Sequence, residues 1–408
     1  MARSTGLSQW QTTVSTHMPH VSKPQALVLA LWSFGMVLAQ SCGLTSVAAT
    51  IAPLVGRQEA TVRQQLREWC YETARKAGVK RGVKREELDV QTCFLPLLRW
   101  VLTWWPPTER RLAFAIDAST LGQRFTVLAI SLMDRGCAIP IAWIVLPATK
   151  KGAWRPHWEH LLTLIRPGVP PDWKVIVMAD RGLYAKWLYR HIQRIGWHPF
   201  LRINVGGNYR PDGHAHVRPL SKAVVQGGAG WSGTVPCFSR SNAHLRCTLL
   251  ARWDAGHTDP WLIRTDLAPE QADGAWYGLR PMIACGFKDT KRGGWHWEQT
   301  KMTDPARATR LWVALAVATL WVVSVGGHAE VTAHASMLDV LPEPVARPTP
   351  RSRPRLLRCF RRGVIVIITT LLLTGERPSG AFHPEPWPET LDTGAIIPDA
   401  RVPQQKAA

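Results

Sequence analysis

Residues 112–117 read LAFAID, and residues 174–180 read KVIVMAD. Each stretch is a short apolar run of the kind that forms a strand buried on both faces, and each ends in an aspartate. A buried carboxylate costs several kcal/mol unless a cation or hydrogen bonds compensate it. Asp117 and Asp180 are therefore predicted to converge at the carboxyl ends of neighbouring strands.

The segments around these two runs predict a mixed α/β sheet. Two more apolar runs flank a turn and predict an antiparallel hairpin, and two segments with helical spacing lie before and after the second aspartate. In chain order, the predicted strands are 112–116, 124–133, 138–146, 174–179 and 198–203, and the predicted helices are 157–165 and 185–195. The resulting order is β-β-β-α-β-α-β.

A pair of aspartates at one sheet edge suits a divalent metal ion. Mg²⁺ prefers hard oxygen ligands, and Mn²⁺ accepts the same set. Two such ions about 4 Å apart would act on the attacking and the leaving oxygen of a phosphodiester. The alternative for each aspartate alone is a strand-end residue that caps the following turn.

The charge of the chain indicates its partner. Its 408 residues include 50 Lys and Arg against 29 Asp and Glu, a formal net charge of +21, which favours nucleic acid over an anionic membrane as the partner.

The composition also excludes several classes of protein. The apolar share of 46% excludes wholesale disorder. The eight cysteines contain no Cys-x-x-Cys pair, which argues against a disulfide framework or a thiolate zinc site. The apolar runs at 26–39 and 311–325 are too short for a membrane span, so we expect a soluble, cytoplasmic protein without a membrane partner.

The N-terminal third predicts a helical DNA-binding domain. Residues 45–51 and 59–71 predict two helices separated by Gly56, which is the outline of a helix-turn-helix. Arg63 and Arg67 are four residues apart, share one face of the second helix, and are predicted to contact DNA. A basic run at 75–85 follows, and the alternative for the whole segment is a plain helical bundle.

The changes of composition predict seven segments. We expect a tail at 1–20, the helical domain at 21–108, a catalytic core at 109–203 and 266–330, a β-rich insertion at 204–265, a basic Pro/Arg linker at 331–362, a short element at 363–374 and a disordered tail at 375–408.

A second candidate site lies at residues 277–291, which predict one helix. At 100° per residue, Tyr277, Arg280, Lys288 and Lys291 fall in one narrow stripe centred on position 284. A stripe of three cations and a tyrosine suits contacts with DNA phosphates better than a core. The alternative is an ordinary solvated helix surface.

Together these motifs resemble the bacterial insertion-sequence DDE transposases of the cut-and-paste branch, over about residues 25–375. The segments AIDAST at 115–120 and ADRG at 179–182 are similar to those around the family's first two acids. Tyr277-x-x-Arg280 followed by Lys291 resembles the Tyr-Arg-Glu-Lys signature, and GFKD at 286–289 and GGWHW at 293–297 also resemble that branch.

The resemblance implies a ribonuclease-H-like core and metal-dependent cleavage and strand transfer at transposon ends. Asp117 and Asp180 would hold two metal ions, Mg²⁺ or Mn²⁺, and Tyr277, Arg280 and Lys291 would grip phosphates near the cleaved bond. The partners would be double-stranded DNA, as transposon ends and as target, and a second copy of the chain, since both ends are brought together.

One departure from the family concerns the third acid. The signature glutamate is replaced by Ala284, whose methyl group cannot bind a metal. Asp289, Glu298 and Glu159 are the other acids considered, and none is an obvious replacement. The leading expectation is therefore a DDE transposase, impaired by Ala284. The alternatives are a catalytically dead, transposase-derived DNA-binding protein and a non-specific nuclease of the same fold.

Overall fold

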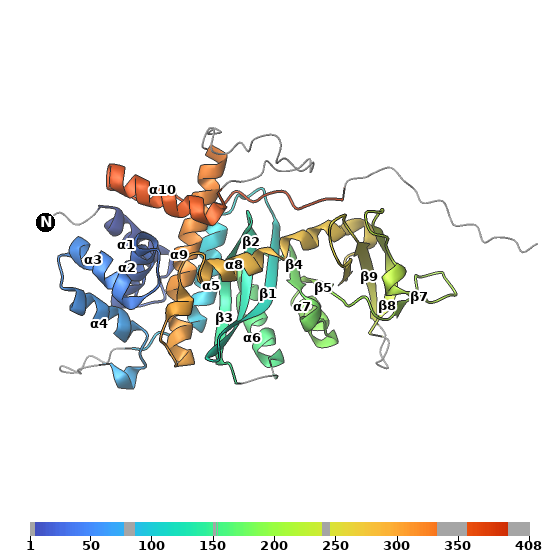
Figure 1. Cartoon of the computed structure of the whole chain (residues 1–408), viewed down its shortest axis with the longest axis horizontal. Helices are drawn as coiled ribbons and strands as arrows, with labels where there is room; N and C mark the ends of the chain where they lie inside the picture. Colours follow the sequence, from blue (N-terminus) through green and yellow to red (C-terminus); the bar gives the residue numbers. More distant parts are fainter. Residues whose placement is uncertain are drawn as a thin grey trace, which may run out of the picture.

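A computed structural model describes residues 5–76, 86–149, 152, 154–238, 245–332 and 357–390. The molecule is elongated, with the N-terminal helices at one end, a sheet in the middle and the later strands at the other end (Figure 1). The predicted linker at 331–362 lies mostly outside the described residues, as do residues 77–85 of the basic run and residues 391–408.

The centre of the fold is one mixed eight-stranded sheet in the order β3-β2-β1-β4-β5-β10-β9-β8. Strand β1 pairs in parallel with β4 and antiparallel with β2. The predicted order β-β-β-α-β-α-β is confirmed. Its elements are β1 (Arg111–Leu121), β2 (Phe125–Asp134), β3 (Cys137–Pro147), α6 (Arg155–Ile165), β4 (Lys174–Ala179), α7 (Lys186–Arg194) and β5 (His198–Arg202).

The β-rich insertion continues this sheet. Strand β10 (Trp261–Thr265) pairs antiparallel with β5, and β9 (Leu245–Arg252) and β8 (Trp231–Cys237) follow outward. The composition of 204–265 predicted strands here without placing β8, in which Gly233 and Pro236 weaken the strand pattern. A separate small hairpin, β6 (Asn208–Tyr209) with β7 (Arg218–Pro219), lies farther out in Figure 1.

Alternation along β1 gives the sheet two different faces. Leu112, Phe114 and Ile116 join the large core cluster, which also holds buried residues of α6 and α7. Ala113 and Ala115 join a smaller cluster together with Tyr277. Because alanines are small, the segment that carries Tyr277 can lie close against β1 on this second face. Asp117 follows Ala113 and Ala115 in the same alternation, so it lies on the same face of β1, at the end of this smaller cluster.

The N-terminal region is helical, as predicted, with α2 (Lys23–Ala39), α3 (Leu44–Val55), α4 (Glu59–Trp69) and α5 (Gln91–Thr103). It does not have a core of its own. Buried side chains from Leu7 to Phe382 form one cluster with the sheet and with α9 (Pro305–Thr332). The indole rings of Trp10 and Trp321, for example, stack 4.2 Å apart.

The predicted tail at 1–20 is wrong for most of its length. Residues Thr5–His17 form helix α1, which buries Leu7, Trp10 and Val14 at helical spacing against the core. Such a short apolar stripe is hard to recognise from sequence, because polar Gln, Ser and Thr residues surround it.

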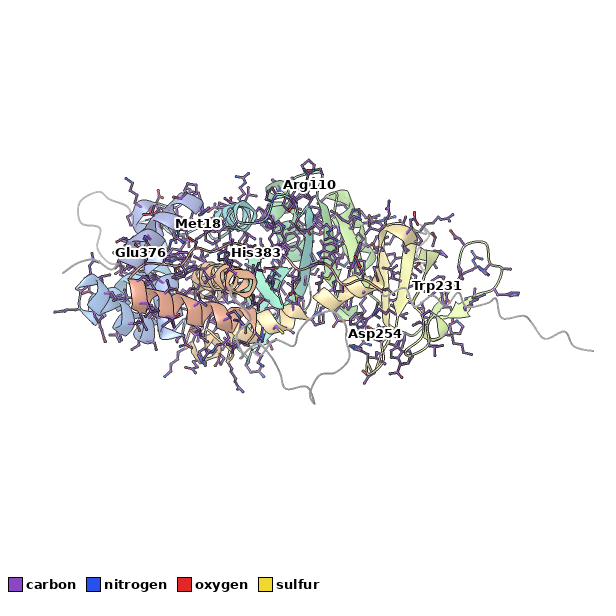
Figure 2. The ribbon with its side chains drawn as sticks, turned by 90° about the horizontal axis from the view of Figure 1, so that it is seen from above. Met18, Arg110, Trp231, Asp254, Glu376 and His383 are labelled. Atoms are coloured by element: carbon purple, nitrogen blue, oxygen red, sulfur yellow. The ribbon has the colours of Figure 1, made fainter. Side chains whose placement is uncertain are left out.

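The C-terminal predictions also need correction. The short element at 363–374 is part of a longer helix, α10 (Cys359–Thr374). Residues 375–390, predicted to be disordered, form an irregular segment that we call the strap. Its prolines have no N–H to donate, so it does not form a helix or strand, and buried Phe382 and Trp387 anchor it instead. Figure 2 places Glu376 beside the N-terminal helices and His383 nearer the sheet.

Helix α9 is long and apolar enough to cross a membrane. Helices α2 and α3 together also have the length and composition of one span, but they are bent by 102° relative to each other. In α9, 94% of the most apolar window is buried inside the protein. Its side chains pack against other parts of the chain, which explains the apolar composition without a bilayer.

Candidate active site

Arg280 brings the two predicted aspartates together. Asp117 lies in the carboxyl half of β1, and Asp180 directly follows β4, the parallel neighbour of β1. The Nη2 atom of Arg280 is 2.9 Å from Asp117 Oδ2 and 3.8 Å from Asp180 Oδ2. One guanidinium nitrogen within reach of both carboxylates places them around a single point, as the strand order predicted.

Backbone donors orient the same two carboxylates. The N–H of Ala118 donates to Asp117 Oδ1 over 2.8 Å, and the N–H of Arg181 donates to Asp180 Oδ1 over 2.6 Å. Burial raises the pKa of Asp117, an effect that the charge of Arg280 and the Ala118 hydrogen bond oppose and that the neighbouring Asp180 reinforces. In each aspartate, Oδ1 is held by the main chain, and Oδ2 faces the shared point.

The predicted single helix at 277–291 is two elements. A 3₁₀ helix, η6 (Gly274–Leu279), ends at Arg280, and α8 (Met282–Thr290) begins after Pro281, which has no N–H to continue the first ladder. Tyr277 is buried, and its hydroxyl donates to the carbonyl of Ala179 over 3.4 Å. The expected direct contact of Tyr277 with DNA therefore does not fit this structure.

Helix α8 carries the rest of the predicted stripe past β1. Lys291, at the end of α8, donates from Nζ to Ser119 Oγ and to the Thr120 carbonyl, each over 2.8 Å. Burial lowers the pKa of Lys291. Ala284 and Lys288 are exposed, one turn apart. The structure thus places Ala284 on α8 between Arg280 and Lys291, which both contact the carboxyl half of β1.

No other acid replaces the missing glutamate in the described part of the chain, where no three His, Cys, Asp or Glu residues are placed to hold a metal. Asp289 is buried and forms two hydrogen bonds with Arg358, of 3.0 and 2.9 Å. Glu298 lies 3.2 Å from His296 Nδ1. Glu159 pairs with Arg155 on α6, whose buried residues join the cluster on the opposite face of β1.

The donor set fits one divalent ion better than two. Asp117 and Asp180 present carboxylate oxygens, which are ligands that Mg²⁺ accepts, to the point that Arg280 Nη2 occupies in this structure, so a bound ion would take the place of that nitrogen. The Nε–H of Arg280 is buried there without a hydrogen-bond partner among the described residues, so the site still has a donor to offer an anion. A second ion would lack a protein carboxylate at Ala284.

The Asp289–Arg358 pair predicts a pH effect on stability. Burial raises the pKa of Asp289 to about 6, although Arg358 pulls it down. Because this pKa is above that of an aspartate in the unfolded chain, the folded chain binds the proton more tightly. The resulting contribution to the free energy of unfolding is complete below about pH 4 and is lost as the pH rises through 6. We expect the stability of the native chain relative to Asp289→Asn to fall between pH 4 and 7, measured by urea unfolding. A constant difference would contradict this prediction.

Arg63 and Arg67 lie apart from this site. Both are exposed on α4, in the helical end of the molecule, and the Arg67 guanidinium lies 5.6 Å from the centre of the Tyr71 ring. Their shared face is available to a partner.

Sequence reasoning missed the neutralisation of both acids by Arg280 and the residues that support η6. Asp273 accepts a hydrogen bond from the N–H of Ala275 over 2.8 Å and caps η6, and an aspartate before a helical stretch is a recognisable capping signal. The ring of Trp276 packs against that of Trp387, 111 positions later in the chain, and no local pattern predicts such a pair.

Residues 122–321, just under half of the chain, match the family model of a transposase DDE domain. That range begins after Asp117 and includes Asp180, Arg280 and α8. Among solved structures, the cryo-EM structure of a piggyBac transposase synaptic complex with hairpin DNA is similar at a TM-score of 0.38 and 9% identity, over 77% of this chain and 71% of that chain. No curated protein matches significantly. The central part of the chain is thus similar to a transposase DDE domain.

Proposed function

We propose that this chain is a DNA transposase of a bacterial insertion sequence, of the branch with the Tyr-Arg-Glu-Lys signature, whose cleavage and strand transfer at transposon ends are impaired by Ala284. The observation that carries the proposal is the pair Asp117 and Asp180 around one point beside Arg280, on neighbouring parallel strands. Its partners would be transposon-end and target DNA and a second copy of the chain, in the cytoplasm and without a membrane.

Asp117 and Asp180 would hold Mg²⁺ or Mn²⁺. A bound ion would activate water and neutralise charge on the scissile phosphate. Arg280 has five N–H donors, more than the two carboxylates accept, so it can also donate to a phosphate oxygen. Lys291 holds the end of α8 on β1 through Ser119 and Thr120, and Tyr277 holds η6 on the strand that leads to Asp180.

A specific observation favours the second candidate, a catalytically dead, transposase-derived DNA-binding protein. Position 284 is an exposed alanine, and the acids considered as substitutes are engaged elsewhere. The two candidates share DNA binding and differ in cleavage.

DNA binding is tested at α4. We expect Arg63→Ala with Arg67→Ala to abolish the preference for element-end over random duplex, while weak non-specific binding persists through the remaining basic surface. The measurement is Kd on both duplexes from about 50 to 200 mM salt, where log K of the native chain should fall by about 0.9 per phosphate neutralised for each tenfold rise in salt.

A matched control removes Arg190 and Arg194, which are also exposed and four residues apart, on α7. This control variant should weaken binding to both duplexes equally. Equal loss on both duplexes in the α4 variant would mean that Arg63 and Arg67 only position the backbone. A flat salt curve for the native chain would exclude nucleic acid as the partner.

A further inference from the structure

The segment that presents Arg280 is a weak element by itself. Helix η6 has six residues in a 3₁₀ conformation, whereas runs beyond three or four are uncommon because their hydrogen bonds are poorly aligned. Arg280 is its C-cap, and its N–H donates to the Tyr277 carbonyl over 3.0 Å. Any fraying of η6 would therefore move the guanidinium that lies between Asp117 and Asp180.

The sheet supports η6 from one side. Trp276 stacks on Phe200 of β5 with ring centres 6.0 Å apart, and Tyr277 packs edge-on against Trp261 of β10 at 5.5 Å. Both rings belong to or pack against the small cluster that also holds Ala113 and Ala115 of β1.

The strap also packs against η6. Trp387 is buried in the same cluster and meets Trp276 edge-on, with ring centres 4.9 Å apart. The Arg111 guanidinium lies 5.2 Å from the centre of the Trp387 ring, which ties the strap to the start of β1. A Cβ placed on Gly278 would lie 3.9 Å from Pro388, so the strap passes beside η6 at this glycine with little room between them.

The end of the strap also holds the cap of η6. Asp273 Oδ1 accepts from the Thr390 hydroxyl over 2.5 Å, and Oδ2 accepts from the Thr390 N–H. Arg252 Nη1 of β9 donates to the same hydroxyl over 2.7 Å. The carboxylate that caps η6 is therefore fixed by a residue 117 positions later in the chain.

The other end of the strap is anchored to different elements. The N–H of Phe382 donates to the Trp104 carbonyl over 2.9 Å, and the Arg377 N–H donates to Gln9 Oε1 over 2.9 Å. In Figure 1 the strap leaves α10 and passes above the sheet toward the side of β9.

We propose that the strap, through Trp387 and Thr390, holds η6 against the sheet and so places Arg280 between Asp117 and Asp180. Trp387 is then a positioning residue of the active site, although it lies outside the matched transposase domain and touches neither carboxylate. This inference rests on the proposed function only in the experiment that measures DNA cleavage.

The first test measures η6 directly, without DNA or metal. We expect Trp387→Ala to speed amide hydrogen exchange at Trp276 and Arg280 at least about tenfold, because a supporting side of a weak helix is lost. Trp387→Phe should keep most of the protection, and Leu372→Ala, at an 80% exposed position of α10, should leave it unchanged. If Trp387→Ala does not fold, Thr390→Val tests the contact between the strap and Asp273 instead. Unchanged exchange at both amides in folded Trp387→Ala or Thr390→Val would overturn the proposal.

The second test uses the Ala284→Glu chain with element-end DNA. Adding Trp387→Ala should lower the nicking rate at least about tenfold and change Kd for the DNA less than about threefold, since Trp387 packs on η6 and β1, whereas the proposed DNA contacts Arg63 and Arg67 are on α4. A loss confined to Kd would contradict the positioning role. If η6 loosens as expected but the Ala284→Glu chain never nicks, the proposed function fails and the role of the strap stands.

Discussion

Ala284→Glu is expected to confer Mg²⁺- or Mn²⁺-dependent nicking of element-end DNA at a rate about a hundredfold or more above that of the native chain. Position 284 is exposed in the first turn of α8, between Arg280 and Lys291, which both contact β1, so a longer acidic side chain has room there. A third carboxylate supplies a ligand whose effect on the transition state is worth several kcal/mol, and each 1.36 kcal/mol or so is tenfold in rate.

The controls for this experiment separate charge from size. Ala284→Gln adds a side chain of the same length without a carboxylate and should stay at the native rate. Asp117→Asn or Asp180→Asn in the Ala284→Glu background should remove the gain. Binding of Mn²⁺, followed by its paramagnetic resonance, should strengthen in Ala284→Glu even without DNA.

Two outcomes would contradict the expectation. Robust nicking by the native chain would mean that another acid completes the site. A folded, DNA-binding Ala284→Glu chain that gains neither Mn²⁺ affinity nor nicking would count against the proposed reaction and favour the DNA-binding alternative.

Gly363→Ala is expected to lower the free energy of unfolding by about 3 kcal/mol or more. Helices α9 and α10 cross with their backbones in contact, and an added Cβ at Gly363 would overlap the carbonyl of Val322. On the facing helix, a Cβ at Gly326 would overlap the carbonyl of Cys359. Since backbone atoms cannot rotate away as a side chain can, α10 would have to separate from α9.

The loss of stability should also come from contacts outside the crossing of α9 and α10. Arg358, the N-cap of α10, pairs with buried Asp289 of α8, so a displaced α10 leaves a buried carboxylate without its cation. Urea unfolding provides the measurement, with Thr369→Ala as the control at an exposed position of the same helix. A change within about 0.5 kcal/mol would show that the helices tolerate separation.

The sheet was predictable because its signal is local. Runs such as 112–117 and 174–180 are apolar without interruption, and that pattern alone distinguishes buried strands from the helices between them. The convergence of Asp117 and Asp180 followed from strand order, because parallel neighbours end at the same sheet edge. The helical character of the N-terminal region was read from periodicity in the same way.

The features that the sequence could not predict depend on contacts between residues that are far apart in the chain. Spacing placed Tyr277 and Arg280 on one exposed helical stripe, but Pro281 divides that helix, Tyr277 turns inward, and Arg280 neutralises two acids. The strap looked disordered because its composition lacks a periodic pattern.

The amino-acid sequence by itself determined the order of strands and helices along the chain, the ends of the two strand runs that carry the aspartates and the absence of a carboxylate at position 284. Each of these is a property of one residue or of a short run, so the local pattern is sufficient. Only the tertiary structure decided that Arg280 lies between the aspartates, that Asp289 belongs to Arg358, and that Trp387 packs on Trp276. Those contacts join residues tens to hundreds of positions apart, and their geometry exists only once the sheet, α8, α10 and the strap have packed together.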